Sequence, residues 1–228
     1  MFPHGGYKDP YKKAKGKERA FFTPGEIKIL LGLPNPESNT GLRDEVLLSV
    51  MYASGARAQE ICDLRIRDIR FSDGKAVLHI VGKGRKARQV QIGKSPTAML
   101  ESYIKHRSLE GKAERHVFSS QTHEHMTVSC IEAIFQKYVS MAKGAHPEMF
   151  KSDSYPPHSM RHTTAVCMLE AGVPLPVIKS FLGHAQLATT EIYASLSQET
   201  VNKKVQEWNE AYWSHCKAEE TVAPTNTP

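Results

Sequence analysis

Seven residues in this chain of 228 have side chains suited to breaking and re-forming a phosphodiester bond. They are Arg57, Glu60, Lys83, His158, Arg161, His184 and Tyr193. A guanidinium group can bind two phosphate oxygens at once, a phenol can attack phosphorus, and an ammonium group can protonate the departing alcohol. Such a set needs no metal ion, and the sequence has no acidic metal-binding cluster, so we expect neither a metal nor a cofactor.

Each of these residues also has a more ordinary interpretation. Arg57 and Glu60 have the spacing of a surface ion pair on a helix. The functional alternative gives Arg57 a fixed fork for phosphate, with Glu60 behind it. His158 and Arg161 could form the exposed basic end of a helix, and Tyr193 could be a half-buried aromatic side chain. Only the conjunction of the motifs favours chemistry.

Two of the motifs depend on special local geometry. Lys83 lies in the turn GKGRK of a predicted hairpin, where it, Arg85 and Lys86 could enter a nucleic-acid groove or only improve solubility. Tyr193 follows His184 by nine residues, which on one straight helix would separate them by about 13–14 Å, too far to share a phosphate. We therefore expect a bend after His184 and a short separate helix that carries Tyr193.

The spacing of apolar residues predicts a mainly α-helical fold with a small antiparallel three-stranded β-sheet, an α+β arrangement. Thr23-Pro24-Gly25-Glu26 has the pattern of a capping box and begins the first helix, which breaks between residues 32 and 41. Ser95-Pro96 is expected to cap another helix. A short helix is predicted to carry residues 57 and 60. The other predicted helices are 42–54, 127–142, 159–171, 174–182, 189–196 and 198–216. The predicted strands are 66–71, 76–81 and 88–92.

Composition and charge narrow the class of protein. Hydrophobic residues make up 40% and charged residues 24%, which is ordinary for a globular protein. No apolar run suits a membrane span or a signal peptide, so we expect a cytoplasmic protein with no membrane partner. The four cysteines are far apart and are predicted to be reduced thiols. The net charge is +6, and the first 20 residues hold six basic against two acidic side chains, which predicts a flexible basic arm.

The order of the motifs resembles the tyrosine recombinase (phage integrase) family, and its shorter, Xer-like bacterial members in particular. The pattern is G-x-R-x-x-E, then GKG-x-K in a hairpin, H-x-x-R, LGH and a tyrosine, and the likeness covers about residues 21–216. It implies the fold of a tyrosine recombinase catalytic domain over 21–216. The arm at 1–20 precedes this domain, and the composition of 217–228, with two prolines and three threonines, predicts a disordered tail after it.

The resemblance also implies a role for each motif. Tyr193 would be the nucleophile that forms a 3′-phosphotyrosyl link and frees a 5′-hydroxyl. Lys83 would be the general acid for the departing oxygen, and His158 would exchange the tyrosine proton. The groups that bind the phosphate would be Arg57, Arg161 and His184. Covalent capture conserves the energy of the broken bond, so neither ATP nor a cofactor would be needed.

The implied partner is double-stranded DNA. Its expected contacts are Lys12, Lys13, Lys15, Lys17, Arg85 and Lys86. Residues 198–216 are expected to form a helix that docks into a neighbouring subunit, which implies a homo-oligomer, a tetramer on DNA. Packing of this helix within its own subunit is the alternative. An accessory DNA-bending protein is a further candidate partner.

The sequence departs from the family pattern at its N-terminus. Family members usually carry an N-terminal helical domain that closes around DNA, whereas about twenty residues precede Thr23 here. We therefore expect either a catalytic-domain fragment or a naturally short enzyme. Two rival functions are a type IB topoisomerase, which usually has lysine where His158 stands, and a catalytically silent DNA-binding module.

Overall fold

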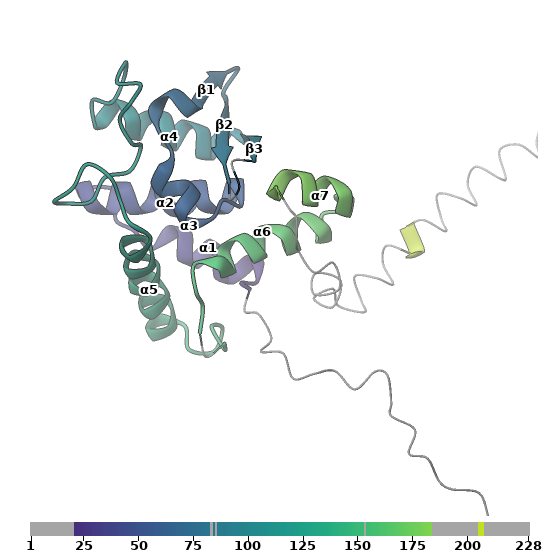
Figure 1. Cartoon of the computed structure of the whole chain (residues 1–228). Helices are drawn as coiled ribbons and strands as arrows, with labels where there is room; N and C mark the ends of the chain where they lie inside the picture. Colours follow the sequence, from purple (N-terminus) through teal and green to yellow (C-terminus); the bar gives the residue numbers. More distant parts are fainter. Residues whose placement is uncertain (1–20, 83, 85, 153, 184–204, 208–228) are drawn as a thin grey trace, which may run out of the picture.

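A computed structural model describes residues 21–82, 84, 86–152, 154–183 and 205–207 of the chain. The elements follow one another as a mainly helical sequence interrupted by three strands (Figure 1). In chain order they are α1 (Pro24–Gly32), α2 (Asn39–Ser54), α3 (Ala58–Asp63), the 3₁₀ turn η1 (Ile66–Asp68), β1 (Ile69–Ser72), β2 (Lys75–Val81), β3 (Ala87–Ile92), α4 (Lys94–His106), α5 (Val128–Ala145), α6 (His158–Glu170) and α7 (Leu175–Leu182). The predicted α+β fold class is confirmed.

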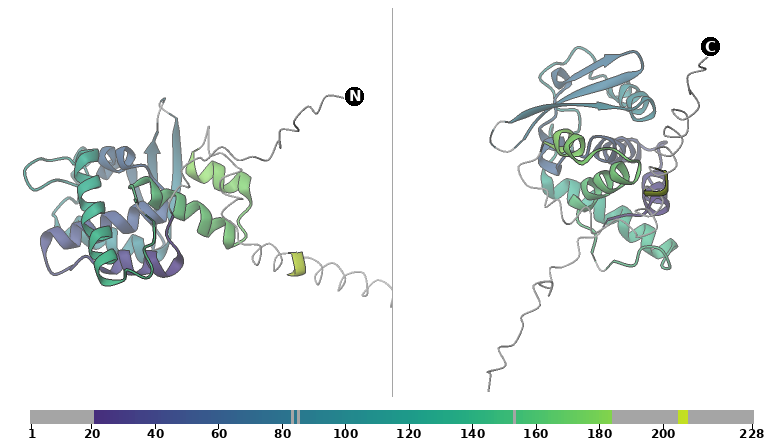
Figure 2. Two further views of the ribbon diagram at one scale, coloured as in Figure 1. Left: turned by 90° about the horizontal axis from the view of Figure 1, so that it is seen from below. Right: turned by 90° about the vertical axis from the view of Figure 1, so that its right-hand side faces the viewer.

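The three strands form an antiparallel sheet in the order β1-β2-β3. Leu78 pairs with Val90 in its centre, and both side chains are buried because the strands alternate between a core face and an outer face. Helices α4 and α2 contact the core face, and α7 lies against the edge strand β3 (Figures 1 and 2). This edge contact brings a late part of the chain next to an early one.

The predicted first strand, 66–71, is only partly correct. Its first half forms the turn η1, because the Asp68 carboxylate accepts a hydrogen bond of 3.0 Å from the backbone N–H of Arg65. An aspartate that satisfies a nearby backbone donor favours a turn over a strand. The pairing with β2 therefore begins only at Ile69.

The helix starts show which local signals were reliable. The capping box at Thr23 is confirmed, since Thr23 and Glu26 exchange backbone and side-chain hydrogen bonds of 3.3 and 2.7 Å. Helix α2 begins three residues earlier than predicted, because the Ser38 hydroxyl caps it by accepting from the N–H of Gly41. Ser95-Pro96 does not cap α4: the helix begins at Lys94, with Gly93 at its N-cap position.

The core is built around α2, which packs against α1, α3, α4, α6 and β3. Its apolar side chains are buried all round the helix, as expected for a central helix. A second, smaller cluster of Ala165, Ile178 and Leu182 joins α6 to α7. Among the described residues, no helix combines the length and apolar character needed to cross a bilayer.

Several predicted segments lie outside the described residues. These are the arm at 1–20, the helix at 189–196, the tail at 217–228 and the helix at 198–216, of which only residues 205–207 are described, as helix. Of the cysteines, Cys62, Cys130 and Cys167 are free thiols, and Cys216 lies outside the described residues.

Candidate active site

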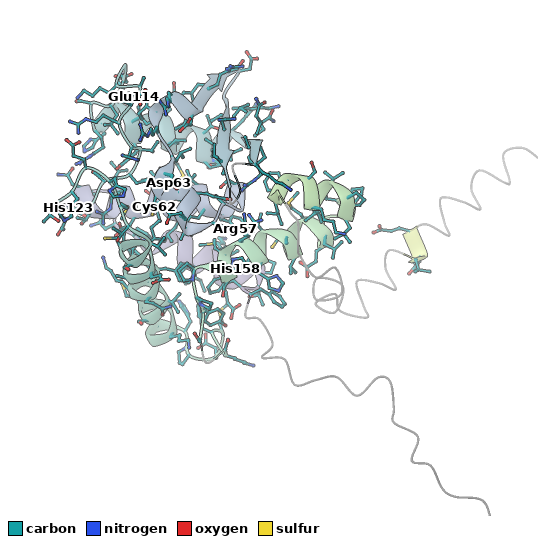
Figure 3. The ribbon with its side chains drawn as sticks, in the orientation of Figure 1. Arg57, Cys62, Asp63, Glu114, His123 and His158 are labelled. Carbon is teal, nitrogen blue, oxygen red and sulfur yellow. The ribbon has the colours of Figure 1, made fainter. Side chains whose placement is uncertain are left out.

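The junction between α2 and α3 presents Arg57. Gly55 ends α2 in the left-handed conformation with a φ of 56°, and Arg57 occupies the N-cap position of α3. The Glu60 carboxylate accepts hydrogen bonds of 2.8 Å from both the backbone N–H and Nη1 of Arg57. The Arg57 side chain, labelled in Figure 3, is 36% exposed, whereas that of Glu60 is 4% exposed, so of these two only the arginine is open to a ligand.

Arg88 on β3 is a site residue that the sequence reasoning missed. Its Nη1 and Nη2 donate to the two Glu60 oxygens at 3.0 and 2.8 Å, and its Nε donates to the Phe181 carbonyl at 3.1 Å. Arg88 lies in phase with the buried residues Val90 and Ile92 on the same strand. An arginine on the core face of a strand was the available signal that it has a buried partner.

Glu60 is a buried carboxylate held in its charged form. Burial by itself raises its pKa, but hydrogen bonds from Arg88 and from the backbone and side chain of Arg57, together with the charge of Arg88, lower the pKa to about 2. The carboxylate is therefore ionised at neutral pH. The ordinary interpretation, a surface ion pair, is wrong for Glu60, which has two arginine partners.

Arg161 lies on α6 and is 2% exposed. Its Nη1 and Nη2 each donate a hydrogen bond of 2.5 Å, the first to the carbonyl of Gly55 and the second to that of Leu182, the last residue of α7. Burial, and then the charge of Arg57, lower the pKa of Arg161 to about 9, so it remains protonated at neutral pH. The exposed-helix-end interpretation is wrong for Arg161.

The other predicted residues are placed less completely. His158 is exposed at the first position of α6, one turn before Arg161, and Figure 3 labels it together with Arg57. Lys86 is exposed beside the hairpin. Outside the described residues lie Lys12, Lys13, Lys15, Lys17, Lys83, Arg85, His184 and Tyr193.

Two glycines show where the segments leading to Lys83 and His184 begin. A Cβ atom on Gly82, the residue before Lys83, would lie 3.1 Å from a Glu60 oxygen. A Cβ on Gly183, the residue before His184, would lie 2.7 Å from the Cδ of Arg88, and Gly183 has a φ of 69°. Both segments therefore start against the Glu60–Arg88 pair.

The cluster carries more positive than negative charge. Among the described residues, the charges of Arg57 and Arg88 act on Arg161, and the carboxylate that acts on it is that of Glu60, which also binds Arg57 and Arg88. Because Arg57 is the half-exposed member, the excess charge is accessible from outside, which suits an anionic ligand such as a phosphodiester. In the part of the chain that the structure describes, no group of three or more His, Cys, Asp or Glu residues could hold a metal ion.

The fold defines the class of protein: it is that of a tyrosine recombinase catalytic domain, as similar solved structures show. In sequence, residues 20–200 match the profile of the phage integrase family. The chain therefore belongs to the phage integrase family, as its motif order predicts.

Curated relatives in sequence include two Xer proteins. Tyrosine recombinase XerC of Syntrophus aciditrophicus (strain SB) is 33% identical over 185 residues, which are 78% of this chain and 57% of that protein. Tyrosine recombinase XerD of Yersinia pestis is 30% identical over 181 residues, which are 78% of this chain and 58% of that protein. The chain thus spans just over half the length of these relatives.

Solved structures agree with the sequence relatives. The crystal structure of XerA recombinase has a TM-score of 0.67 and 26% identity, and the match covers 86% of this chain and 65% of that one. The post-cleavage complex of XerH recombinase with its palindromic difH substrate has a TM-score of 0.68 and 20% identity, over 85% of this chain and 54% of that one.

Proposed function

We propose that this chain is the catalytic domain of a site-specific DNA recombinase that cleaves and rejoins strands through a 3′-phosphotyrosyl intermediate. The observation that carries the proposal is the arginine cluster of this member of the phage integrase family: Arg57 binds Glu60, and Arg161, from a distant part of the chain, binds the carbonyl of Gly55, two residues before Arg57. A buried and a half-exposed guanidinium at one site suit the non-bridging oxygens of a phosphodiester, whose negative charge rises in the transition state.

In the proposed reaction the Tyr193 oxygen bonds to the scissile phosphorus and the bond from phosphorus to the 5′-oxygen breaks. His158 takes the phenol proton and Lys83 gives a proton to the 5′-oxygen, so the leaving group departs as a hydroxyl. A phenol of ordinary pKa about 10 needs such help at neutral pH. Attack by the 5′-hydroxyl of another strand reverses these steps without ATP. Arg57, Arg161 and His184 hold the phosphate.

Double-stranded DNA is the proposed partner, in line with the XerH structure, which is bound to its palindromic difH substrate. The proposed contacts are Lys12, Lys13, Lys15, Lys17, Arg85 and Lys86. A homo-tetramer joined through residues 198–216 and an accessory DNA-bending protein remain parts of the proposal. Access to DNA would place the enzyme in the cytoplasm.

The test is the covalent adduct. Nicked duplexes tiled across the DNA that flanks the source gene are incubated with the protein, and a denaturing gel then shows any protein–DNA band. A nick next to the cleaved phosphate lets a short fragment leave and traps the intermediate. We expect a band from the unaltered chain and none from Tyr193→Phe.

Tyr103→Phe is the matched control. It makes the same chemical change at a buried hydroxyl that has no hydrogen-bond partner among the described residues, so it should keep the band. A band that survives Tyr193→Phe would refute the assignment of the nucleophile. DNA binding with no band, even after an N-terminal domain from a Xer relative is attached, would favour the silent DNA-binding module.

The topoisomerase alternative makes a separate prediction: relaxation of supercoiled plasmid by the monomer, with no exchange between sites. The relatives described above are recombinases, which favours strand exchange. For the basic arm, deletion of residues 8–19 should weaken DNA binding and reduce its dependence on salt. Unchanged binding and an unchanged salt slope would remove the arm from the proposed interface.

A further inference from the structure

Arg88 has no role in the reaction proposed above, although it contacts two elements of the site. Its side chain is 9% exposed and lies between α3 and the end of α7. All three of its donor nitrogens have acceptors, two on Glu60 of α3 and one on the carbonyl of Phe181 near the end of α7. An arginine with this many hydrogen-bond partners fixes the positions of the groups that it binds.

The first neighbour is Glu60, whose carboxylate accepts two hydrogen bonds from Arg57 and two from Arg88. The paired bonds from Arg88 fix the plane of the carboxylate, since both oxygens are held by one rigid fork. Arg57 is bound to this carboxylate through its Nη1, so the plane of Glu60 sets the direction in which Arg57 points. Its remaining donors stay available at the half-exposed side of the site.

The second neighbour is the carboxyl end of α7, where the last carbonyls of a helix lack partners within the helix. Arg88 binds the carbonyl of Phe181 and Arg161 binds the next one, that of Leu182. Arg161 also binds the carbonyl of Gly55, two residues before Arg57. The contacts therefore close a ring that runs through Arg57, Glu60, Arg88, the end of α7 and Arg161, then back to the start of α3.

We propose that Arg88 is a positioning residue that closes this ring. It aims Arg57 at the phosphate, and it fixes the point at which the chain leaves α7 toward His184. It also supplies the positive charge that offsets Glu60. Without Arg88, the carboxylate would neutralise Arg57 alone, and less positive charge would face the phosphate. This inference rests on the proposed recombinase function for its kinetic test.

The kinetic test compares Arg88→Gln with Arg70→Gln, a matched change at an exposed arginine on β1 of the same sheet. With the nicked duplex that gives the adduct, single-turnover cleavage is measured at saturating protein, and DNA binding is measured separately. Arg88→Gln should slow cleavage on the order of 10- to 100-fold while the dissociation constant changes little. Arg88→Lys keeps the charge but cannot reach both α3 and α7, so its rate should fall in between.

A second substrate separates positioning from a general defect in folding. It carries a methylphosphonate at the cleavage site, which has one anionic oxygen fewer for Arg57 to hold. On this substrate the loss caused by Arg88→Gln should shrink, in parallel with the loss caused by Arg57→Ala. An equal loss on both substrates, or a rate for Arg88→Gln that matches Arg70→Gln, would overturn the inference.

A third measurement needs no DNA and no activity. In ¹H–¹⁵N spectra of the full chain, the Nε–H signal of Arg57, assigned by its absence in Arg57→Lys, should shift or broaden in Arg88→Gln or Arg88→Lys. An unchanged Arg57 signal in both variants would overturn the inference. Absence of an adduct from the unaltered chain would instead count against the proposed function, and this spectrum would still decide the role of Arg88.

Discussion

The two arginines assigned to the phosphate are held in opposite ways. Arg57 is 36% exposed at the start of a short helix, and the partner of its side chain is a carboxylate. Arg161 is 2% exposed within α6, and it donates to two backbone carbonyls from separate parts of the chain. Arg57 thus has a charged partner and an open side, whereas Arg161 has fixed dipoles and almost no open surface.

This difference assigns the two residues different duties. A carbonyl cannot change its charge and is fixed by the backbone, so Arg161 joins α2 to α7 and stays cationic in a buried place, with a pKa lowered to about 9 by burial. Arg57 depends on Glu60 for its direction and keeps donors free on its exposed side. We therefore expect Arg161 to matter for both folding and chemistry, and Arg57 for chemistry alone.

The largest effect on folding is expected from Arg161→Ala. It would leave two buried carbonyls without their donor and open a cavity, so the free energy of unfolding should fall by about 3 kcal/mol. Urea denaturation of this variant and of Arg70→Ala, at an exposed position, measures the difference. Equal midpoints for the two variants would show that the carbonyl contacts of Arg161 do not support the fold.

Acid should remove the contribution of Glu60 to the free energy of unfolding. The folded state lowers the pKa of this carboxyl from 4.5 to about 2. Its contribution is therefore complete above about pH 4.5, declines as the pH falls toward 2, and amounts to about 3 kcal/mol. The difference in unfolding free energy between the unaltered chain and Glu60→Gln should shrink between pH 5 and pH 3. A difference that is independent of pH would contradict the buried, doubly paired carboxylate.

A smaller loss of unfolding free energy is expected from Gly55→Ala, which tests the turn between α2 and α3. Gly55 has a φ of 56°, and an added Cβ would lie 2.4 Å from the Cδ2 of Leu182. The strain and the clash together should cost about 2–3 kcal/mol and move the carbonyl that Arg161 binds. Gly74→Ala is the control, with a φ of 69° and open space around its Cβ, so it should cost about 1 kcal/mol. Equal losses would mean that the contact with Leu182 gives way easily.

Most of the fold was predictable from local signals, because the capping box at Thr23 and the alternation in β2 and β3 are short-range patterns. The site was only partly predictable. Arg57 and Arg161 were found through their motifs. The burial of Arg161 was not predictable, because the side chains of α6 that face the core are partly polar. Thr163 and Thr164 are buried there and bond to backbone carbonyls, so α6 lacks an apolar stripe.

Arg88 was missed for a related reason. Its partners, Glu60 and Phe181, are distant in sequence, and the one local sign of its burial is that it lies in phase with Val90 and Ile92 on the strand. Its place on the core face follows only from the position of the strand. The structure was therefore needed to find the long-range pairing of buried charges, whereas the motif residues assigned to the phosphate could be found from the sequence.

The smallest effect on folding is expected from Arg57→Ala. Glu60 keeps both bonds from Arg88 and the bond from the backbone of residue 57, and the repulsion that lowers the pKa of Arg161 is relieved. The free energy of unfolding should therefore change by less than about 1 kcal/mol. Cleavage of the nicked duplex should nevertheless fall on the order of 100-fold or more, since a donor to the phosphate is lost. Denaturation and single-turnover cleavage of the same preparation measure both quantities.

A loss of stability as large as that of Arg161→Ala would mean that the carboxylate-bound arginine also supports the fold, and the division of duties between the two residues would be wrong.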